Sequence, residues 1–118
     1  MAPTAPGANA YNQTVGFGDT WGGRFMQPID YTAVSTSYLG GAGNGEGPLD
    51  PKAFGCPESL QFCVGGGSED GTLFAIAYPS GKGYCTWSLR FYVSTTGAEL
   101  ANAQSAAGVV FKLWGFGV

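Results

Sequence analysis

The side chains that most often perform chemistry in proteins are scarce in this chain, and those present lack a catalytic spacing. The 118 residues include no histidine, which removes the commonest general base and the usual partner of a nucleophilic serine or cysteine. Catalysis by paired carboxylates needs two acids brought together, and no pattern selects a pair among Asp19, Asp30, Glu69 and Asp70. Because no nucleophile, base and orienting group can be named together, we expect no enzymatic activity.

Two glycine-rich segments also lack the spacing of nucleotide-binding loops. Gly81-Lys82-Gly83 has no serine or threonine after the lysine, which a phosphate loop requires. The glycines between positions 40 and 47 do not form a Gly-x-Gly-x-x-Gly pattern between a strand and a helix. A structural zinc site needs four Cys or His ligands, and the chain has only three cysteines. The sequence therefore predicts no metal and no cofactor.

The three cysteines, Cys56, Cys63 and Cys85, leave two interpretations open. An odd count argues against a closed disulfide framework. Cys56 and Cys63 flank six residues and would close a small loop as a disulfide in an oxidising environment, whereas two reduced thiols are favoured in the cytosol. The first ten residues lack the basic and apolar regions of a secretory signal, so we expect synthesis in the cytoplasm without a signal peptide.

Charge and hydropathy argue against two classes of partner. Nucleic-acid binding requires clustered cations, and the five cations of this chain are spread along a sequence of net charge −3. The apolar run at 73–78 is far shorter than the roughly 20 residues of a membrane-spanning helix. We therefore expect neither nucleic acid nor membrane as a partner. The low share of charged residues, 11%, leaves two interpretations open: a loop-rich soluble domain, or a surface largely covered by neighbours in an assembly.

Strand periodicity dominates the second half of the chain. Every second residue between 84 and 95 is apolar, which predicts a β-strand with one buried face. The segment 72–78 predicts its antiparallel hairpin partner, connected through 79–82. We expect this register because it pairs the large side chains Phe74 with Leu89 and Ile76 with Trp87 on the core side.

Four further segments complete the prediction of a mainly β fold. Strands are predicted at 31–38, 60–64 and 109–114. A short helix is predicted at about 97–107, because Thr96 and Glu99 fit a capping box and Gly108 fits a helix end. Residues 40–58, rich in glycine and proline, are expected to form a long loop. The expected architecture is a small antiparallel β-sandwich or partly open barrel that spans 15–118 as one domain.

Residues 1–14 differ from the rest and predict an extended N-terminal arm, because they are rich in Ala, Pro, Gly, Thr and Asn. An extended arm can add a strand to a neighbour's sheet edge, and the predicted assembly contacts are Pro3, Thr4, Pro6 and Tyr11. In size and arm composition the chain resembles the small decoration proteins of tailed-phage capsids. The resemblance implies an accessory structural subunit of a virion or other large particle. Such a subunit would bind copies of itself, a trimer being one option, and a larger protein shell through its arm and β edges.

A carbohydrate-binding or adhesive β-module is the alternative hypothesis. Sugar rings stack on exposed aromatic side chains, and strand aromatics would supply such a platform. The candidate platform residues are Trp21, Tyr31, Tyr38 and Tyr92. The competing interpretation is that Trp21 belongs to the core and that the three tyrosines are amphipathic strand residues.

Overall fold

The fold is mainly β, as the sequence predicts. A computed structural model describes residues 5–7, 10–13, 19–21, 24–41, 44–80 and 86–118, with side chains described at 5–7, 10 and 11 and from Pro28 onward within those ranges. This part of the chain contains seven strands and one short 3-10 turn. The elements are β1 (Tyr11–Gln13), β2 (Asp19–Trp21), β3 (Arg24–Thr32), η2 (Pro51–Phe54), β4 (Leu60–Ser68), β5 (Leu73–Pro79), β6 (Trp87–Val93) and β7 (Val110–Gly117).

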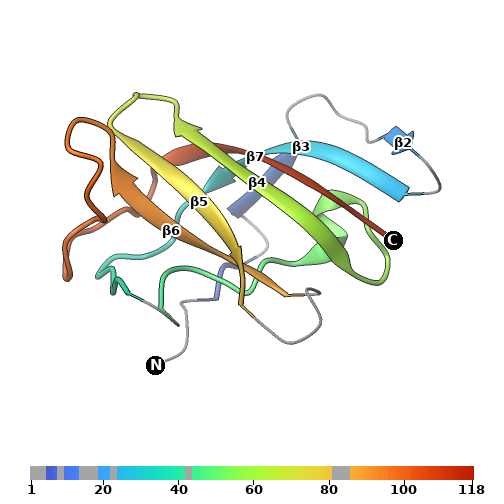
Figure 1. The fold of residues 1–118 in the computed structure, drawn as a ribbon, viewed down its shortest axis with the longest axis horizontal. Coiled ribbons are helices and arrows are strands. Elements are labelled where there is room, and N and C mark those ends of the chain that lie inside the picture. The colour runs from blue at the N-terminus through green and yellow to red at the C-terminus, as the bar shows by residue number, and fades with distance from the viewer. Residues whose placement is uncertain (1–4, 8–9, 14–18, 22–23, 42–43, 81–85) are drawn as a thin grey trace.

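The strands form one antiparallel sheet that folds over on itself. Their order is β1-β3-β7-β4-β5-β6, with β2 also paired to β3. Although β4 and β5 separate β7 from β6 in this order, Phe111 of β7 stacks on Phe91 of β6 with ring centroids 4.7 Å apart. Figure 1 shows β5 and β6 crossing in front of β7 and β3. The result is an open, two-layered arrangement of the sandwich or partly open barrel type, and its core lies between the layers.

The hairpin of β5 and β6 is confirmed, but its predicted register is wrong. Ala75 pairs with Phe91, and Ala77 pairs with Leu89. The small alanines therefore point inward opposite the large side chains, while Phe74, Ile76 and Tyr78 point outward. The physical reason is space, because Phe91 and Leu89 are fully buried and already fill the interior with Phe111.

The predicted helix at 97–107 is wrong. Glu99 forms a β-bridge with Tyr92, and Ala103 has a left-handed φ of 67° that an α-helix excludes. The backbone N–H of Leu100 donates to the Phe91 carbonyl, and that of Ala103 donates to the Tyr38 carbonyl. Carbonyl groups of neighbouring segments thus replace the carbonyls that a helix would supply, and the alanine-rich segment follows the body of the domain as turns.

The predicted strand at 31–38 is displaced toward the N-terminus. Strand β3 ends at Thr32, and residues 33–38 run beside 103–109 as an irregular segment. The N–H of Ala33 donates to the Val109 carbonyl at 2.9 Å, and the N–H of Tyr38 donates to the Gln104 carbonyl at 2.9 Å. The predicted strands at 60–64 and 109–114 are confirmed and extend further, as β4 and β7.

The predicted arm is shorter than 1–14. Strand β1 pairs with β3, and Ala10 just before it is buried. The ring of Tyr11 packs edge-on against Tyr31 and Phe54, and its hydroxyl accepts a hydrogen bond from the Asp50 N–H at 3.0 Å. Tyr11, which is half-buried, therefore anchors β1 to the body of the domain. Among the other predicted contacts, Pro6 is half-buried, and Pro3 and Thr4 lie outside the described residues.

Candidate functional site

The carboxylates named as candidates lie in two surface clusters. Lys112 of β7 carries its ammonium 2.5 Å from Asp30 and 3.5 Å from Glu69, with the lysine and Glu69 more than half exposed. Asp70 lies in the β4–β5 turn, where the Ser68 hydroxyl and the Thr72 N–H and hydroxyl donate to it. These hydrogen bonds lower the pKa of Asp70 to about 2. The side chain of Asp19, the remaining candidate, is outside the described set. Asp30 and Glu69 therefore form ion pairs at the surface, and Asp70 accepts hydrogen bonds within a turn.

Sequence reasoning missed a carboxylate that is wholly buried. Glu46, in the middle of the predicted glycine-rich loop, is 0% exposed. It accepts hydrogen bonds from the Tyr31 hydroxyl and from the backbone N–H groups of Val34 and Ser35. Burial and the neighbouring Glu46 carboxyl raise the pKa of Tyr31. This arrangement joins the loop to the end of β3, a structural role that the surrounding glycines conceal in the sequence.

Glu99 makes a second junction of the same kind. Its carboxylate accepts a hydrogen bond from the Tyr38 hydroxyl at 2.6 Å and from the Gly41 N–H at 3.0 Å. Burial, followed by the hydrogen bond to Glu99, raises the pKa of Tyr38. Both tyrosines are therefore protonated donors that tie loops to the core.

Two of the four aromatic residues named for a sugar platform are fully buried. Tyr31 and Tyr38 are 0% exposed, so neither offers a ring face to a ligand. Tyr92 stacks on Phe74 with ring centroids 5.3 Å apart. The side chain of Trp21 is outside the described set. Tyr31 and Tyr38 are core residues, and Tyr38 lies outside any strand, so the expectation of amphipathic strand tyrosines does not hold for these two.

Cys56 and Cys63 are both buried, and no disulfide joins them. Burial raises the pKa of the Cys63 thiol to about 12 and also raises the pKa of the Cys56 thiol. A thiol held protonated in this way is a poor nucleophile and a poor metal ligand. Cys85 lies outside the described residues.

The long loop at 44–50 covers the outer edge of β6 instead of forming a ligand-binding loop. Glu46 and Leu89 exchange two backbone hydrogen bonds, at 2.9 and 2.7 Å, and the Leu49 N–H donates to the Trp87 carbonyl at 2.7 Å. The other half of the edge is bonded to residues 98–100. The β6 edge is therefore unavailable for the predicted addition of a partner strand.

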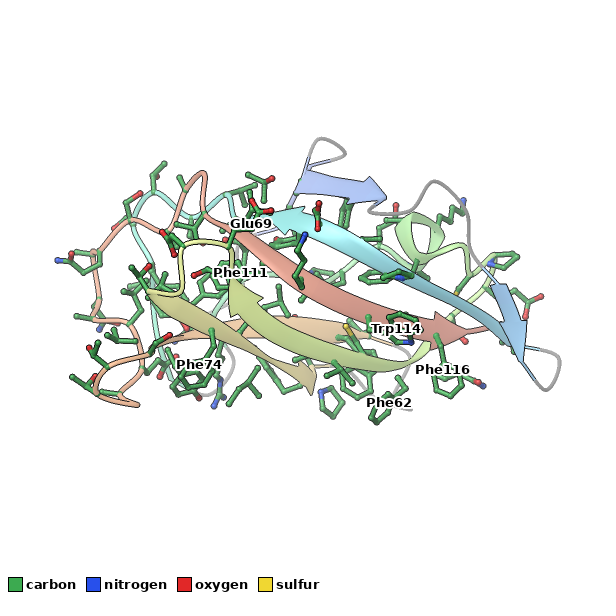
Figure 2. All side chains as sticks on the ribbon, turned by 90° about the horizontal axis from the view of Figure 1, so that it is seen from above. Phe62, Glu69, Phe74, Phe111, Trp114 and Phe116 are labelled. Atoms are coloured by element: carbon green, nitrogen blue, oxygen red, sulfur yellow. The ribbon has the colours of Figure 1, made fainter. Side chains whose placement is uncertain are left out.

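The outer face of β4 and β7 is the most exposed apolar surface of the described residues. We call it the β4–β7 face and define it by Phe62, Val64, Trp114 and Phe116. The register pairs Phe62 with Phe116 and Val64 with Trp114, so all four side chains leave the sheet on one side. Figure 2 shows Phe62, Trp114 and Phe116 grouped near the C-terminal end of β7, with Phe74 apart from them. The exposed fractions are 49% for Phe62, 47% for Val64 and 43% for Trp114.

A shallow groove of about 280 Å³ lies on this side of the sheet, beside Trp114. Pro28 and Val64 line it together with the tryptophan, and Gly65 and Gly66 contribute only backbone. Lys112 is the one charged residue that lines it, and this lysine is paired with Asp30 and Glu69. The groove is therefore suited to an apolar group.

Comparison with known proteins gives no relative of this chain. Neither the models of known protein families, nor the curated proteins, nor the solved structures contain a match. Within the described ranges, no three or more Cys, Asp or Glu side chains are grouped to hold a metal ion, and no helix is long and apolar enough to cross a membrane. We therefore infer the function from the fold and the surface of the chain itself.

Proposed function

We propose that this chain is a structural assembly subunit, a small accessory protein of the decoration or cement type that binds a viral or phage capsid-type shell. The observation that carries the proposal is the number of large apolar side chains on its surface. In a chain with only 11% charged residues, such side chains favour coverage by other proteins. The large apolar residues that are more than a third exposed are Leu39, Phe62, Val64, Ile76 and Trp114.

The fixed position of Tyr11, at the end of the N-terminal segment, supports a role of this segment in attachment. Tyr11 is fixed by ring contacts to Tyr31 and Phe54 and by the hydrogen bond from Asp50. Strand β1 is therefore fixed to the body of the domain at the point where the N-terminal segment joins it. Of the residues before β1, Ala5 and Gly7 are exposed. An anchored segment rich in Ala, Pro and Thr can add to the sheet edge of a shell protein through its main chain.

The covered edge of β6 favours a subunit of a particle of limited size over a subunit of a growing fibre. Strand addition at a long open edge would allow chains to polymerise. Here the loop at 44–50 and the segment at 98–100 occupy that edge. The side of β1, where the N-terminal segment joins the body, is the attachment side in this proposal.

Sedimentation of the native particle tests this proposal. We expect the full chain to co-sediment with a large particle at fixed stoichiometry, and a variant lacking residues 1–7 to lose attachment while its circular dichroism stays unchanged. Thr95→Ala, at an exposed turn far along the sequence, is the matched control and should attach normally. Equal attachment of the truncated chain would refute the role of the arm. A full chain that sediments alone in its native source would refute the proposal as a whole.

No observation favours the carbohydrate-binding alternative. Trp114 is exposed, but the groove beside it offers Lys112 as its one charged side chain. Sugar hydroxyls need several hydrogen-bonding partners, and an apolar groove leaves them unsatisfied.

A further inference from the structure

The β4–β7 face carries both a projecting ring and a groove that fits one. Phe62 of β4 packs edge-on against Trp87 and Phe116 and keeps 49% of its surface exposed. Val64, two residues further along the same strand, lines the groove. Residues two apart in a strand lie on the same face, so the ring and the groove open toward the same side.

The size and lining of the groove match an aromatic ring. Its volume is about 280 Å³, and an apolar cavity of about 150 Å³ is large enough to bind benzene. Trp114, Pro28 and Val64 provide apolar walls. The ammonium of Lys112 is already bound to Asp30 and Glu69, so an apolar group entering the groove leaves no charge unpaired.

We propose that the occupant of the β4–β7 face is a second copy of this chain, with Phe62 of each copy seated in the groove of the other. Because the ring and the groove open on one face, two copies must meet face to face. A twofold axis then satisfies both contacts at once, whereas a cyclic trimer needs the two features on different sides. The inference rests on the proposed function and extends it, since it assigns the contact between copies to this face and leaves shell attachment to the N-terminal segment.

The exposed area is consistent with the centre of a dimer interface. An aromatic side chain buries 150–250 Å², so Phe62 and Trp114, each nearly half exposed, together offer roughly 150–250 Å² of apolar surface, to which Val64 adds. A standard interface buries about 800 Å² per partner around such a centre. The charged residues Asp30, Lys112 and Glu69 lie at the end of this face away from Phe62, where a polar rim in contact with water is expected.

Sedimentation equilibrium of the purified full chain tests this inference without the shell. We expect a reversible dimer with a dissociation constant between about 1 μM and about 1 mM. Val64→Glu should raise the dissociation constant at least about tenfold, because its carboxylate would be desolvated in the interface. Ile76→Glu, at an equally exposed position of β5, is the matched control and should dimerise normally. A monomer at every concentration, a trimer, or a Val64→Glu variant that dimerises like the parent would overturn the inference.

A complementary pair of variants tests the specific contact. Phe62→Lys alone and Val64→Glu alone should each dimerise poorly, because each homodimer contains the defect twice. An equimolar mixture should recover association, since one half of the mixed interface is unaltered and the other pairs opposite charges. Absence of recovery, with both variants folded by circular dichroism, would contradict the seating of Phe62 in the groove. These measurements use the isolated chain, so their failure is distinguishable from a failure of shell attachment.

Discussion

Two surfaces of the folded sheet carry aromatic side chains, and they differ in how those side chains are partnered. On the outer face of β5 and β6, Phe74 stacks on Tyr92, and the Arg90 guanidinium lies 4.7 Å from the Tyr78 ring centre. On the β4–β7 face, Phe62 and Phe116 meet edge-on, yet Phe62 stays 49% exposed and a groove opens beside Trp114.

The difference shows that aromatic content alone does not mark an interaction surface. Phe74, Tyr78, Arg90 and Tyr92 bury much of one another within a single chain, and the Tyr78 hydroxyl also donates to the Asn44 carbonyl. On the β4–β7 face, Phe62 also packs edge-on against Trp87, but Phe62 and Trp114 keep nearly half of their surface exposed. An aromatic surface with open rings and an adjacent hollow is the one expected to bind another protein.

The largest expected effect concerns the loop that supports the partnered face. Glu46→Ala should lower the free energy of unfolding by about 3 kcal/mol or more. The buried donors on Tyr31 and Ser35 and the part-buried N–H of Val34 lose their acceptor, and each unsatisfied donor costs about 1–3 kcal/mol. Urea unfolding measures this, in a Val64→Glu background so that dimerisation does not contribute. Glu46→Gln keeps an acceptor oxygen and should cost less. A loss below about 1 kcal/mol for Glu46→Ala would contradict the assigned role.

A smaller effect separates the two faces directly. Phe74→Ala should lower the free energy of unfolding of the monomer by about 1 kcal/mol, because it removes the stacked pair with Tyr92. Val64→Ala, at a 47% exposed position, should change it by less than about 0.5 kcal/mol, although it should weaken the dimer. Urea titrations at chain concentrations well below the dissociation constant of the dimer provide both values. Equal losses of the free energy of unfolding for the two variants would contradict the proposed difference between the faces.

The smallest effect is expected at the turn that connects the two faces. The pKa of Asp70 is lowered from 3.8 to about 2 in the folded chain. Because the pKa of this carboxyl is lower in the folded than in the unfolded chain, its ionised form stabilises the fold at any pH above the unfolded-state pKa. This stabilisation is lost as the pH falls from about 4 toward 2. Asp70→Asn should remove this pH dependence, as measured by urea unfolding at several pH values. Parallel curves for parent and variant would refute the role of Asp70.

The fold class was predictable because strand periodicity is strong, but the choice of buried face was not. In β5 both alternating sets are apolar, and the larger set of Phe74, Ile76 and Tyr78 points outward because Phe91 and Leu89 leave room only for Ala75 and Ala77. The same ambiguity affects β7, where Phe111 and Leu113 are buried while Trp114 is 43% exposed. Interior volume, which depends on side chains far away in the sequence, decides these cases.

The predicted helix and the missed carboxylate have a common cause. Residues 97–107 have helical composition, and Glu46 lies among glycines, so local signals favour a helix in one case and an exposed loop in the other. Long-range partners override both, through the bridge of Glu99 to Tyr92 and the hydrogen bond of Tyr31 to Glu46. The candidate site was missed for a related reason, because nothing local distinguishes Trp114 from a core residue of the closing strand.

Hydroxyl-radical footprinting across a range of chain concentrations tests most directly whether the β4–β7 face is covered by a second copy. Phe62 and Trp114 report on the face, and Ile76, which is 46% exposed on β5, serves as the internal reference. We predict that labelling of Phe62 and Trp114 falls as the concentration rises while labelling of Ile76 stays constant. Labelling of all three residues that does not change with concentration would contradict the account.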